Sequence, residues 1–515
     1  MGIPNVWKEL EPLKRSVSLV ELAVREGFLR NARKNRTLVV GIDASVWIVE
    51  CQAVFYVRGL HTQAGENPEL RTLFFRLAHL LHYPITPIFV FDGPERPNCK
   101  CGTTVKKKDH SVVKYLIKLI KDFRYKFHMA PGEAEAELAE LERHGIIDFA
   151  ITTDSDYFLF GGTRLIRNLH IKTPGDDDAE IYVTKDTAAM AADYDTVGLP
   201  GCGIVTAVTL SSTPLAADLL AAAEGSTEAE LELYIPEWRS QLRKTLITNP
   251  NGDLPNHRTT LASKIPDDFP NPHVVYLYAR PVTSWSKGGC GPQFDNLQPQ
   301  FPDTEQLAFH CERLFGWGTT IVDKFQRYVW PGYCIRTFSQ SLLTPSSIRH
   351  IYKQDNKFKS NSAFESYGIE MWLRPLPVVA LSGARRALED ENAVVKGDAT
   401  CTSLDVWVPG PILRNAAPAV VDTFLRNAPS RMKKATVATG VYVPLLPAIP
   451  NPTPTTTPGS IIFDQGTSMQ SSSKLDNALS NEVIELSDTS SYHFYDKIQA
   501  SACTPTSTLP NEFMK

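Results

Sequence analysis

Three short apolar runs, each ending at an aspartate, constrain the fold of this chain more than any other feature of its sequence. The runs occupy residues 38–42, 88–91 and 149–153, and they end at Asp43, Asp92 and Asp154. Segments with apolar residues at helical spacing, such as residues 68–82 and 113–123, lie between them. Short buried strands that alternate with helices predict an α/β fold, in which flanking helices cover both faces of a parallel central sheet.

Length and composition limit the class of protein to which the chain can belong. At 515 residues the chain is long enough for two or three domains. Its formal net charge of −4 gives no overall attraction to nucleic acid, so any nucleic-acid surface must be a local patch. The nine cysteines, an odd number, fit reduced thiols better than a disulfide framework. No apolar run approaches the ~20 residues that span a bilayer, so we expect a soluble intracellular protein without membrane contact.

The aspartates that end the three runs should lie close together. Ligands of parallel α/β sheets bind beyond the carboxyl ends of the strands, and Asp43, Asp92 and Asp154 are expected there. Asp156 follows Asp154 closely, and Glu133 and Glu135 open the helix that leads into the third strand. Clustered carboxylates repel one another, and hard divalent cations such as Mg²⁺ or Mn²⁺ relieve that repulsion. Two such ions about 4 Å apart can activate a water and stabilise the leaving oxygen of a phosphodiester.

Each acidic fragment alone has a simpler interpretation. A strand-end aspartate is commonly a helix cap or a turn residue, and Glu133, Glu135 and Glu137 alone would suit a solvated helix face. Asp154-Ser-Asp156 alone would also suit the nucleophile of a haloacid-type phosphatase. Four such fragments, in order on alternating strands and helices, favour a shared metal site over these alternatives.

With these motifs the chain resembles the flap-endonuclease/XPG structure-specific nucleases, and among them the Holliday-junction-resolving branch, especially its fungal members. The resemblance covers residues 1–175, and its motifs are Met1-Gly-Ile-Pro-Asn-Val-Trp7, Gly41-Ile-Asp43-Ala-Ser45, Val90-Phe-Asp92-Gly-Pro94, Ala130-Pro-Gly-Glu133-Ala-Glu135-Ala-Glu137 and Thr153-Asp154-Ser-Asp156. It implies a PIN-like nuclease domain that hydrolyses phosphodiesters in branched DNA. The catalytic metal ligands that it implies are Asp43, Asp92, Glu133, Glu135, Asp154 and Asp156.

The family also has a further aspartate and a helix-two-turn-helix that grips duplex DNA through a glycine-rich turn. By resemblance Asp193, in Ala191-Ala-Asp193-Tyr-Asp195, is the seventh catalytic metal ligand, and Gly201 and Gly203 contact DNA. The segment between Asp156 and Asp193 is short, and residues 204–210 carry no charge. We therefore expect a degenerate form of the helix-two-turn-helix.

Basic residues lie between two of the acidic motifs. Lys106, Lys107 and Lys108 form a cluster, and Lys114, Lys118 and Lys121 lie on the helical face opposite the apolar stripe. A solvated charged helix is the simpler interpretation. Beside an acidic metal site, the same face suits a polyanion such as DNA. By resemblance this stretch is the arch over the active site, and Gly2, just after the start, lies beside the active site and contacts DNA.

The C-terminal half divides less clearly. We expect a nuclease domain over residues 1–210, with an N-region at 1–98, the arch at 96–128 and an I-region at 129–210. A helical or irregular extension at 211–300, a chromodomain-like α+β module at 301–430 and a disordered Pro/Ser/Thr-rich tail at 447–515 would follow. In the module, Trp372 and Trp407 would serve core packing, a methyl-lysine cage or an extended DNA surface.

These expectations describe a nuclear, metal-dependent endonuclease that cuts flaps, forks or four-way junctions with two Mg²⁺ ions, or with Mn²⁺ in their place. A homodimer on four-way junctions and a chromatin contact are further expectations, and Arg431-Met-Lys-Lys434 is a candidate import signal. The alternative from another class is a junction-binding or chromatin-associated protein with weakened catalysis, which the short segment before Asp193 motivates.

Overall fold

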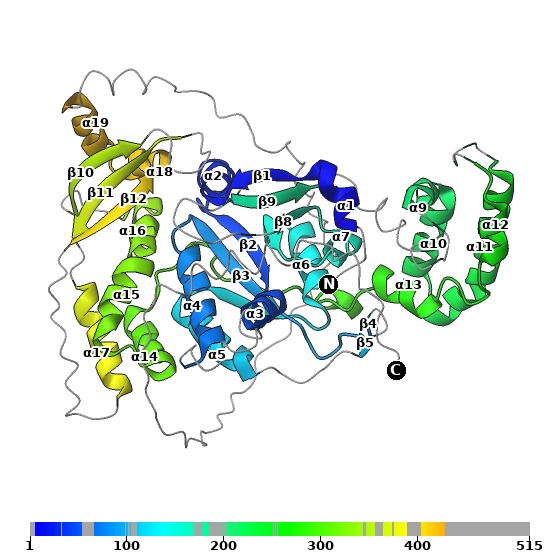
Figure 1. Ribbon diagram of the computed structural model, residues 1–515, viewed down its shortest axis with the longest axis horizontal. Helices are drawn as coiled ribbons and strands as arrows, with labels where there is room; N and C mark the ends of the chain where they lie inside the picture. Colours follow the sequence, from blue (N-terminus) through cyan, green and yellow to red (C-terminus); the bar gives the residue numbers. More distant parts are fainter. Residues whose placement is uncertain are drawn as a thin grey trace, which may run out of the picture.

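The computed structural model places a central sheet between two further parts of the chain: a helical lobe to one side and a smaller sheet with helices to the other (Figure 1). The structure describes residues 6–31, 33–53, 66–97, 99–100, 103–104, 111–167, 169, 178–184, 199, 202, 204–211, 213–250, 252, 254, 256–342, 347–355, 364–372, 375–388 and 403–427. The expected disordered tail at 447–515 lies outside these residues.

Seven strands form the central sheet, in the order β1-β9-β8-β7-β2-β3-β6. The five from β8 to β6 are mutually parallel, as the sequence predicts, whereas β9 and β1 add an antiparallel edge that it does not. The strands are β1 (Arg15–Ser18), β2 (Leu38–Asp43), β3 (Ile85–Phe91), β6 (Lys126–Met129), β7 (Phe149–Ile151), β8 (Arg164–Arg167) and β9 (Asp178–Val183).

Both faces of this sheet are covered. Every residue of β2 is buried, and alternate side chains enter different apolar clusters: Leu38 and Val40 on one face, Val39 on the other. The first face is covered by α2 (Leu19–Leu22), a helical turn (Ala23–Leu29), α3 (Ala44–Ala53), α4 (Pro68–Leu80) and α5 (Ser111–Asp122). The second is covered by α1 (Val6–Leu10), α6 (Ala134–Arg143) and α7 (Asp156–Leu159). A 3-10 turn (Glu11–Leu13) and the small hairpin β4 (Cys99–Lys100) with β5 (Thr103–Thr104) complete this part.

Helix α5 is part of the helical layer. Its side chains Leu116, Leu119 and Ile120 are fully buried, and it packs against α4 and against α14 (Thr304–Phe315). The arch expected at 96–128 includes this helix, and residues 98, 101–102 and 105–110 of that stretch lie outside the described residues. The apolar stripe of α5 fixes the helix to the core, because burying leucine and isoleucine side chains against α4 and α14 removes apolar surface from water.

Helices α9 (Ile204–Ser211), α10 (Pro214–Gly225), α11 (Glu228–Thr248), α12 (Thr259–Lys264) and α13 (Pro272–Ala279) form the lobe (Figure 1). It has its own apolar core, in which Leu219, Leu231 and Trp238 are nearly or fully buried. Thr227 and Glu230 start α11 with a reciprocal capping box. Of the helical or irregular extension expected at 211–300, the described residues are largely helical, and the last part returns to the core, where Trp285 packs beside α6.

The C-terminal part is α+β, as predicted. A three-stranded antiparallel sheet carries the strands β10 (Ile348–Asp355), β11 (Ser366–Trp372) and β12 (Ser403–Pro409) in that order. The helices are α14, α15 (Ile321–Tyr328), α16 (Trp330–Ser339), α17 (Leu376–Ala387), α18 (Gly410–Ala416) and α19 (Pro418–Asn427), with 3-10 turns at Ser286–Gly288 and Gly318–Thr320.

The apolar core of this C-terminal part is continuous with that of the central sheet. Phe74 of α4 stacks on Phe325 of α15, with ring centroids 6.3 Å apart, and Ile369 of β11 belongs to the same cluster. The region expected as a module at 301–430 thus shares one apolar core with the central sheet. Among the described helices, none combines the length and apolarity that crossing a membrane requires.

Candidate active site

The three strand-end aspartates lie at the carboxyl ends of neighbouring strands. Asp43 is the last residue of β2, Asp92 follows β3, and Asp154 follows β7. The strand order β7-β2-β3 places the reversal of chain connections beside β2, where ligands of such sheets bind. The predicted convergence of these runs is therefore present in the fold.

Asp43 is both a helix cap and a member of the acidic cluster. It is 2% exposed, and its Oδ1 accepts hydrogen bonds from the backbone N–H groups of Ser45 (3.0 Å) and Val46 (3.2 Å) at the start of α3. The Thr152 hydroxyl donates to its Oδ2 at 3.1 Å. The cap interpretation does not exclude the functional one here, because one oxygen starts the helix while the other faces β7.

Asp92 connects β3 to the start of α6. Its Oδ2 accepts hydrogen bonds from the Ser45 hydroxyl (2.8 Å) and the Arg96 guanidinium (3.0 Å), and its Oδ1 accepts one from the backbone N–H of Ala134 (3.0 Å). Ser45 thus touches both Asp43, through its backbone, and Asp92, through its side chain. Arg96 places a positive charge directly on this carboxylate.

Asp154 and Asp156 are both fully buried. The backbone N–H of Asp156 donates to Asp154 Oδ1 at 3.2 Å, which closes a tight turn between β7 and α7. The Tyr278 hydroxyl of α13 donates to Asp156 Oδ2 at 3.3 Å. The pair is therefore held between the end of a core strand and a helix of the lobe.

The glutamates of α6 divide into two groups. Glu133 is the extended N-cap residue and is partly exposed, whereas Glu135, in the first turn, is 6% exposed. Glu137 is fully buried, 2.9 Å from His128 Nε2 and 2.8 Å from the backbone N–H of Ser284. Burial alone would raise the pKa of Glu137, but hydrogen bonds from His128 and Ser284 outweigh it and lower that pKa. Glu137 thus has a structural role.

The cluster is electrostatically strained. The pKa of Asp43 is raised from 3.8 to about 7, first by burial and then by the negative charge of Asp92, with a smaller contribution from Asp154. A carboxyl with this pKa is ionised at neutral pH only at a cost. A cation near these oxygens would remove that cost.

The donor set fits a hard divalent cation, because the predicted ligands offer only carboxylate oxygens. Within the described ranges, no three acidic, histidine or cysteine side chains are already arranged around one ion. The oxygens instead accept hydrogen bonds from Ser45, Thr152 and Arg96. A carboxylate oxygen has a second lone pair, so these hydrogen bonds leave acceptor capacity for a cation.

The predicted DNA-contacting residues are only partly described. Lys114, Lys118 and Lys121 are exposed on α5, opposite its buried stripe, as the helical spacing predicts. Asp193 and the other predicted contacts lie outside the described residues: Gly2, Lys106, Lys107, Lys108, Gly201 and Gly203.

Sequence reasoning missed four side chains that hold the acids. Ser45 and Thr152 lie next to the acidic motifs, so their hydroxyls could have been considered from spacing alone. Arg96 lies four residues after Asp92, at the start of the stretch expected as the arch. Tyr278 lies 122 residues from its partner Asp156, and no local pattern marks it.

A parallel sheet with acids at the carboxyl ends of three neighbouring strands defines an α/β metallonuclease-type core. Residues 1–114 match the XPG N-terminal domain and residues 124–202 match the XPG I-region. Both matches lie in the N-terminal part of the chain, and the resemblance inferred from its motifs is confirmed.

The chain is similar to flap endonucleases of more than one kind. Flap endonuclease GEN homolog 1 of Mus musculus is 25% identical over 236 residues, which are 39% of this chain and 24% of that protein. Flap endonuclease 1 of Nanoarchaeum equitans is 32% identical over 224 residues, which are 36% of this chain and 60% of that protein. This chain thus spans about a quarter of the length of the GEN relative.

The fold also agrees with a solved structure of the same branch. A crystal structure of the Holliday junction-resolving enzyme GEN1, in complex with product DNA, Mg²⁺ and Mn²⁺ ions, superposes with a TM-score of 0.62 at 26% identity. The match covers 82% of this chain and 98% of that one. It therefore extends well beyond the two XPG regions into the lobe and the C-terminal part.

Proposed function

We propose that this chain is a metal-dependent endonuclease that hydrolyses phosphodiester bonds in branched DNA. The observation that carries the proposal is the convergence of Asp43, Asp92 and Asp154 at neighbouring strand ends, with the pKa of Asp43 raised to about 7 by burial and by the other two charges. Such an arrangement is costly unless it binds cations. The XPG regions and the GEN relatives support the same conclusion.

Two Mg²⁺ ions, or Mn²⁺ in their place, would activate a water and stabilise the leaving oxygen of the scissile phosphodiester. Asp43, Asp92, Asp154 and Asp156 would hold them from the sheet side, Glu133 and Glu135 from the start of α6, and Asp193 from outside the described residues. Ser45 and Thr152 orient the carboxylates of Asp92 and Asp43. This reaction would need no side-chain nucleophile, because water is the nucleophile and the carboxylates only position the ions that activate it.

The DNA would be recognised by shape. Exposed Lys114, Lys118 and Lys121 on α5 provide phosphate contacts, which position a duplex without reading its sequence. The glycine turn with Gly201 and Gly203, Gly2, and the lysines at 106–108 would add further contacts. Relatives named for flap and Holliday-junction cleavage make flaps and four-way junctions the substrates to test first.

Three finer points belong to the same proposal. A four-way junction is separated by two nicks, so two copies of the chain would act together on it. Action on chromosomal DNA implies residence in the nucleus. A chromatin contact stays a prediction: Arg349 lies 4.5 Å over the Trp372 ring and Lys353 5.6 Å over the Trp407 ring, so the chain's own cations cover both predicted cage aromatics.

One assay tests the proposal. Purified protein is incubated with labelled flap and four-way-junction DNA in Mg²⁺, in EDTA, and as the Asp154→Asn variant. Nicking that needs Mg²⁺ and is lost in the variant supports the endonuclease. Binding without nicking by the native protein in Mg²⁺ would refute it in favour of the junction-binding alternative, which the Arg96 contact with Asp92 also favours.

A further inference from the structure

The chain returns from the lobe to the core through residues 278–286, which we call the strap. It begins in α13, between the lobe and the central sheet (Figure 1), and ends in the turn at Ser286–Gly288. None of the acidic motifs of the sequence includes it. Three successive contacts join it to the elements that carry the predicted metal ligands.

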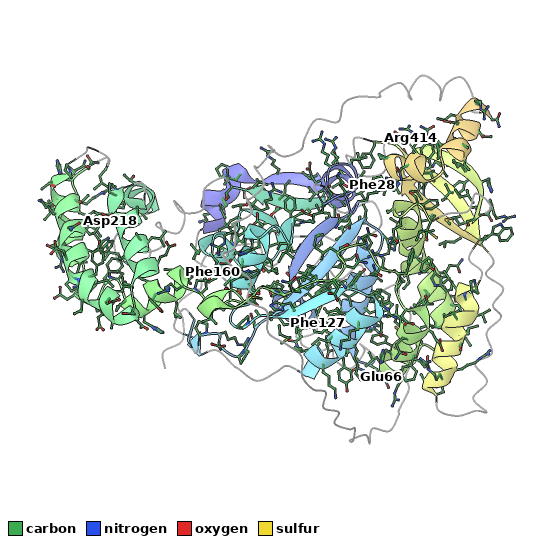
Figure 2. All side chains as sticks on the ribbon, turned by 180° about the vertical axis from the view of Figure 1, so that it is seen from behind. Phe28, Glu66, Phe127, Phe160, Asp218 and Arg414 are labelled. Carbon is green, nitrogen blue, oxygen red and sulfur yellow. The ribbon has the colours of Figure 1, made fainter. Side chains whose placement is uncertain are left out.

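The first contact is made by Tyr278. Its hydroxyl donates to Asp156 Oδ2 at 3.3 Å, and its ring stacks on Phe160 with centroids 5.6 Å apart and planes 22° apart. Phe160 follows α7 and lies on the side of the core that faces the lobe (Figure 2). Tyr278 is therefore held by its ring and orients the carboxylate with its hydroxyl.

The second contact is a close backbone approach. A Cβ atom at Gly132 would lie 2.4 Å from the carbonyl oxygen of Val282, so only glycine lets the strap lie against this loop. Gly132 directly precedes Glu133, the N-cap of α6. The strap thus bounds the loop that presents Glu133.

The third contact fixes the body of α6. The backbone N–H of Ser284 donates to Glu137 Oε2 at 2.8 Å, and the Ser284 hydroxyl lies 3.1 Å from His128 Nε2. Trp285 then stacks on His144 at the far end of the helix, with centroids 4.3 Å apart. The start, the middle and the end of α6 all touch the strap or its immediate neighbours.

We propose that the strap is a positioning device for the metal ligands, with Tyr278 as its key positioning residue. It holds Asp156 by a charge-assisted hydrogen bond and holds the start of α6, which carries Glu133 and Glu135, by backbone contacts. Because it continues directly from α13, it also fixes the distance between the lobe and the acids. The inference rests on the proposed function, since it assigns the strap to the same metal site.

Physical reasoning gives the size of the effect. Groups that orient metal-ligating carboxylates affect metal affinity about 10–100-fold when they are removed. Tyr278→Phe keeps the ring on Phe160 and removes only the hydroxyl. We expect it to weaken Mn²⁺ binding to the DNA-free protein by about tenfold, with the same increase in the Mg²⁺ concentration for half-maximal cleavage. DNA affinity in Ca²⁺ should not change, because the lost hydroxyl bonds to Asp156 and the apolar core of the lobe and the lysines of α5 keep their side chains.

The matched control is Tyr276→Phe, in the same helix. Tyr276 packs at the lobe core beside Arg280, and among the described residues its hydroxyl makes no hydrogen bond. Free Mn²⁺ is measured by electron paramagnetic resonance, cleavage in single turnover, and folding by thermal melting. Tyr276→Phe should match the native protein in all three measurements.

The outcomes separate the strap from the proposed function. If Tyr278→Phe binds Mn²⁺ as the native protein does, or if Tyr276→Phe loses the same affinity, the positioning role is wrong. If the native protein binds Mn²⁺ but cuts no branched DNA, the proposed function fails while the Mn²⁺ comparison still decides on the strap. If it neither binds Mn²⁺ nor cuts DNA, both are overturned.

Discussion

Replacing Asp43 with asparagine should make the metal-free protein more stable at neutral and alkaline pH. The asparagine oxygen can still accept the backbone N–H groups of Ser45 and Val46, which start α3, so the cap is kept. Its amide nitrogen would face Thr152, whose hydroxyl can rotate to accept. What the substitution removes is a buried negative charge beside Asp92 and Asp154.

The size follows from the pKa of Asp43, which is 3.8 in an unfolded chain and about 7 in the folded protein. Because the folded pKa is the higher one, the native carboxyl costs nothing below pH 3.8, and its cost grows as the pH rises toward 7. A difference of about 3 pKa units corresponds to about 4 kcal/mol in the free energy of unfolding. Asp43→Asn should recover much of this at pH 8 and almost none near pH 4.

The measurement is the free energy of unfolding in urea from pH 4 to pH 8, in EDTA, for native protein and variant. Subtracting the free energy of unfolding of the native protein from that of the variant at each pH cancels the contributions of the other titrating groups. Adding Mg²⁺ at about 100 times its Kd should stabilise the native protein at pH 8 by about 2.7 kcal/mol and the variant by less. Asp218→Asn, an exposed change in the lobe (Figure 2), serves as the control. If the two free energies of unfolding differ by the same amount at every pH, or do not differ at pH 8, the Asp43 carboxylate is not destabilised by burial and by its acidic neighbours.

Three further substitutions test the fold and the DNA surface. Gly93→Ala would place a Cβ 1.8 Å from the carbonyl oxygen of Ala130, so the start of α6 must move; we expect a loss of about 2 kcal/mol by urea unfolding and loss of cleavage, and unchanged cleavage would contradict this. Leu116→Ala in α5 should lower the free energy of unfolding by about 3 kcal/mol, since the side chain is fully buried; a surface-like loss under about 0.5 kcal/mol would show that α5 is not fixed to the core. Alanine should also replace the three exposed lysines of α5: Lys114, Lys118 and Lys121. We expect the slope of log K for junction binding against log salt concentration, measured by fluorescence anisotropy, to become shallower by about 1 per lost contact. An unchanged slope would exclude these lysines from the interface.

The strand-end acids could be predicted from sequence because their signal is local. A short apolar run followed by aspartate is visible within six residues, and parallel topology then brings the strand ends of β2, β3 and β7 together. The start of α6 after Pro131-Gly132 was predictable for the same reason. Acids that follow directly on a strand or begin a helix could thus be found from the local residue pattern and its periodicity.

The remainder depends on contacts between distant segments. Nothing in the local sequence of Tyr278 marks it as a partner of Asp156, and nothing near Glu137 predicts that Ser284 satisfies its carboxylate. The apolar stripe of α5 predicted a buried face but not what covers it, and the covering helix, α14, starts only at Thr304. Partner choice at such sequence separations is set by tertiary packing, which propensity and spacing do not encode.

The shared apolar core has a consequence for shortened forms of the protein. A chain that stopped near residue 300 would keep every predicted acid described here, yet it would uncover Phe74, whose ring packs against Phe315, Trp317 and Phe325. A premature stop codon or a protease cut in the linker before α14 would therefore yield an aggregating polypeptide instead of a minimal, deregulated DNA-cutting fragment. In this architecture the C-terminal segment is a safeguard: cleavage activity and the integrity of the full polypeptide are lost together.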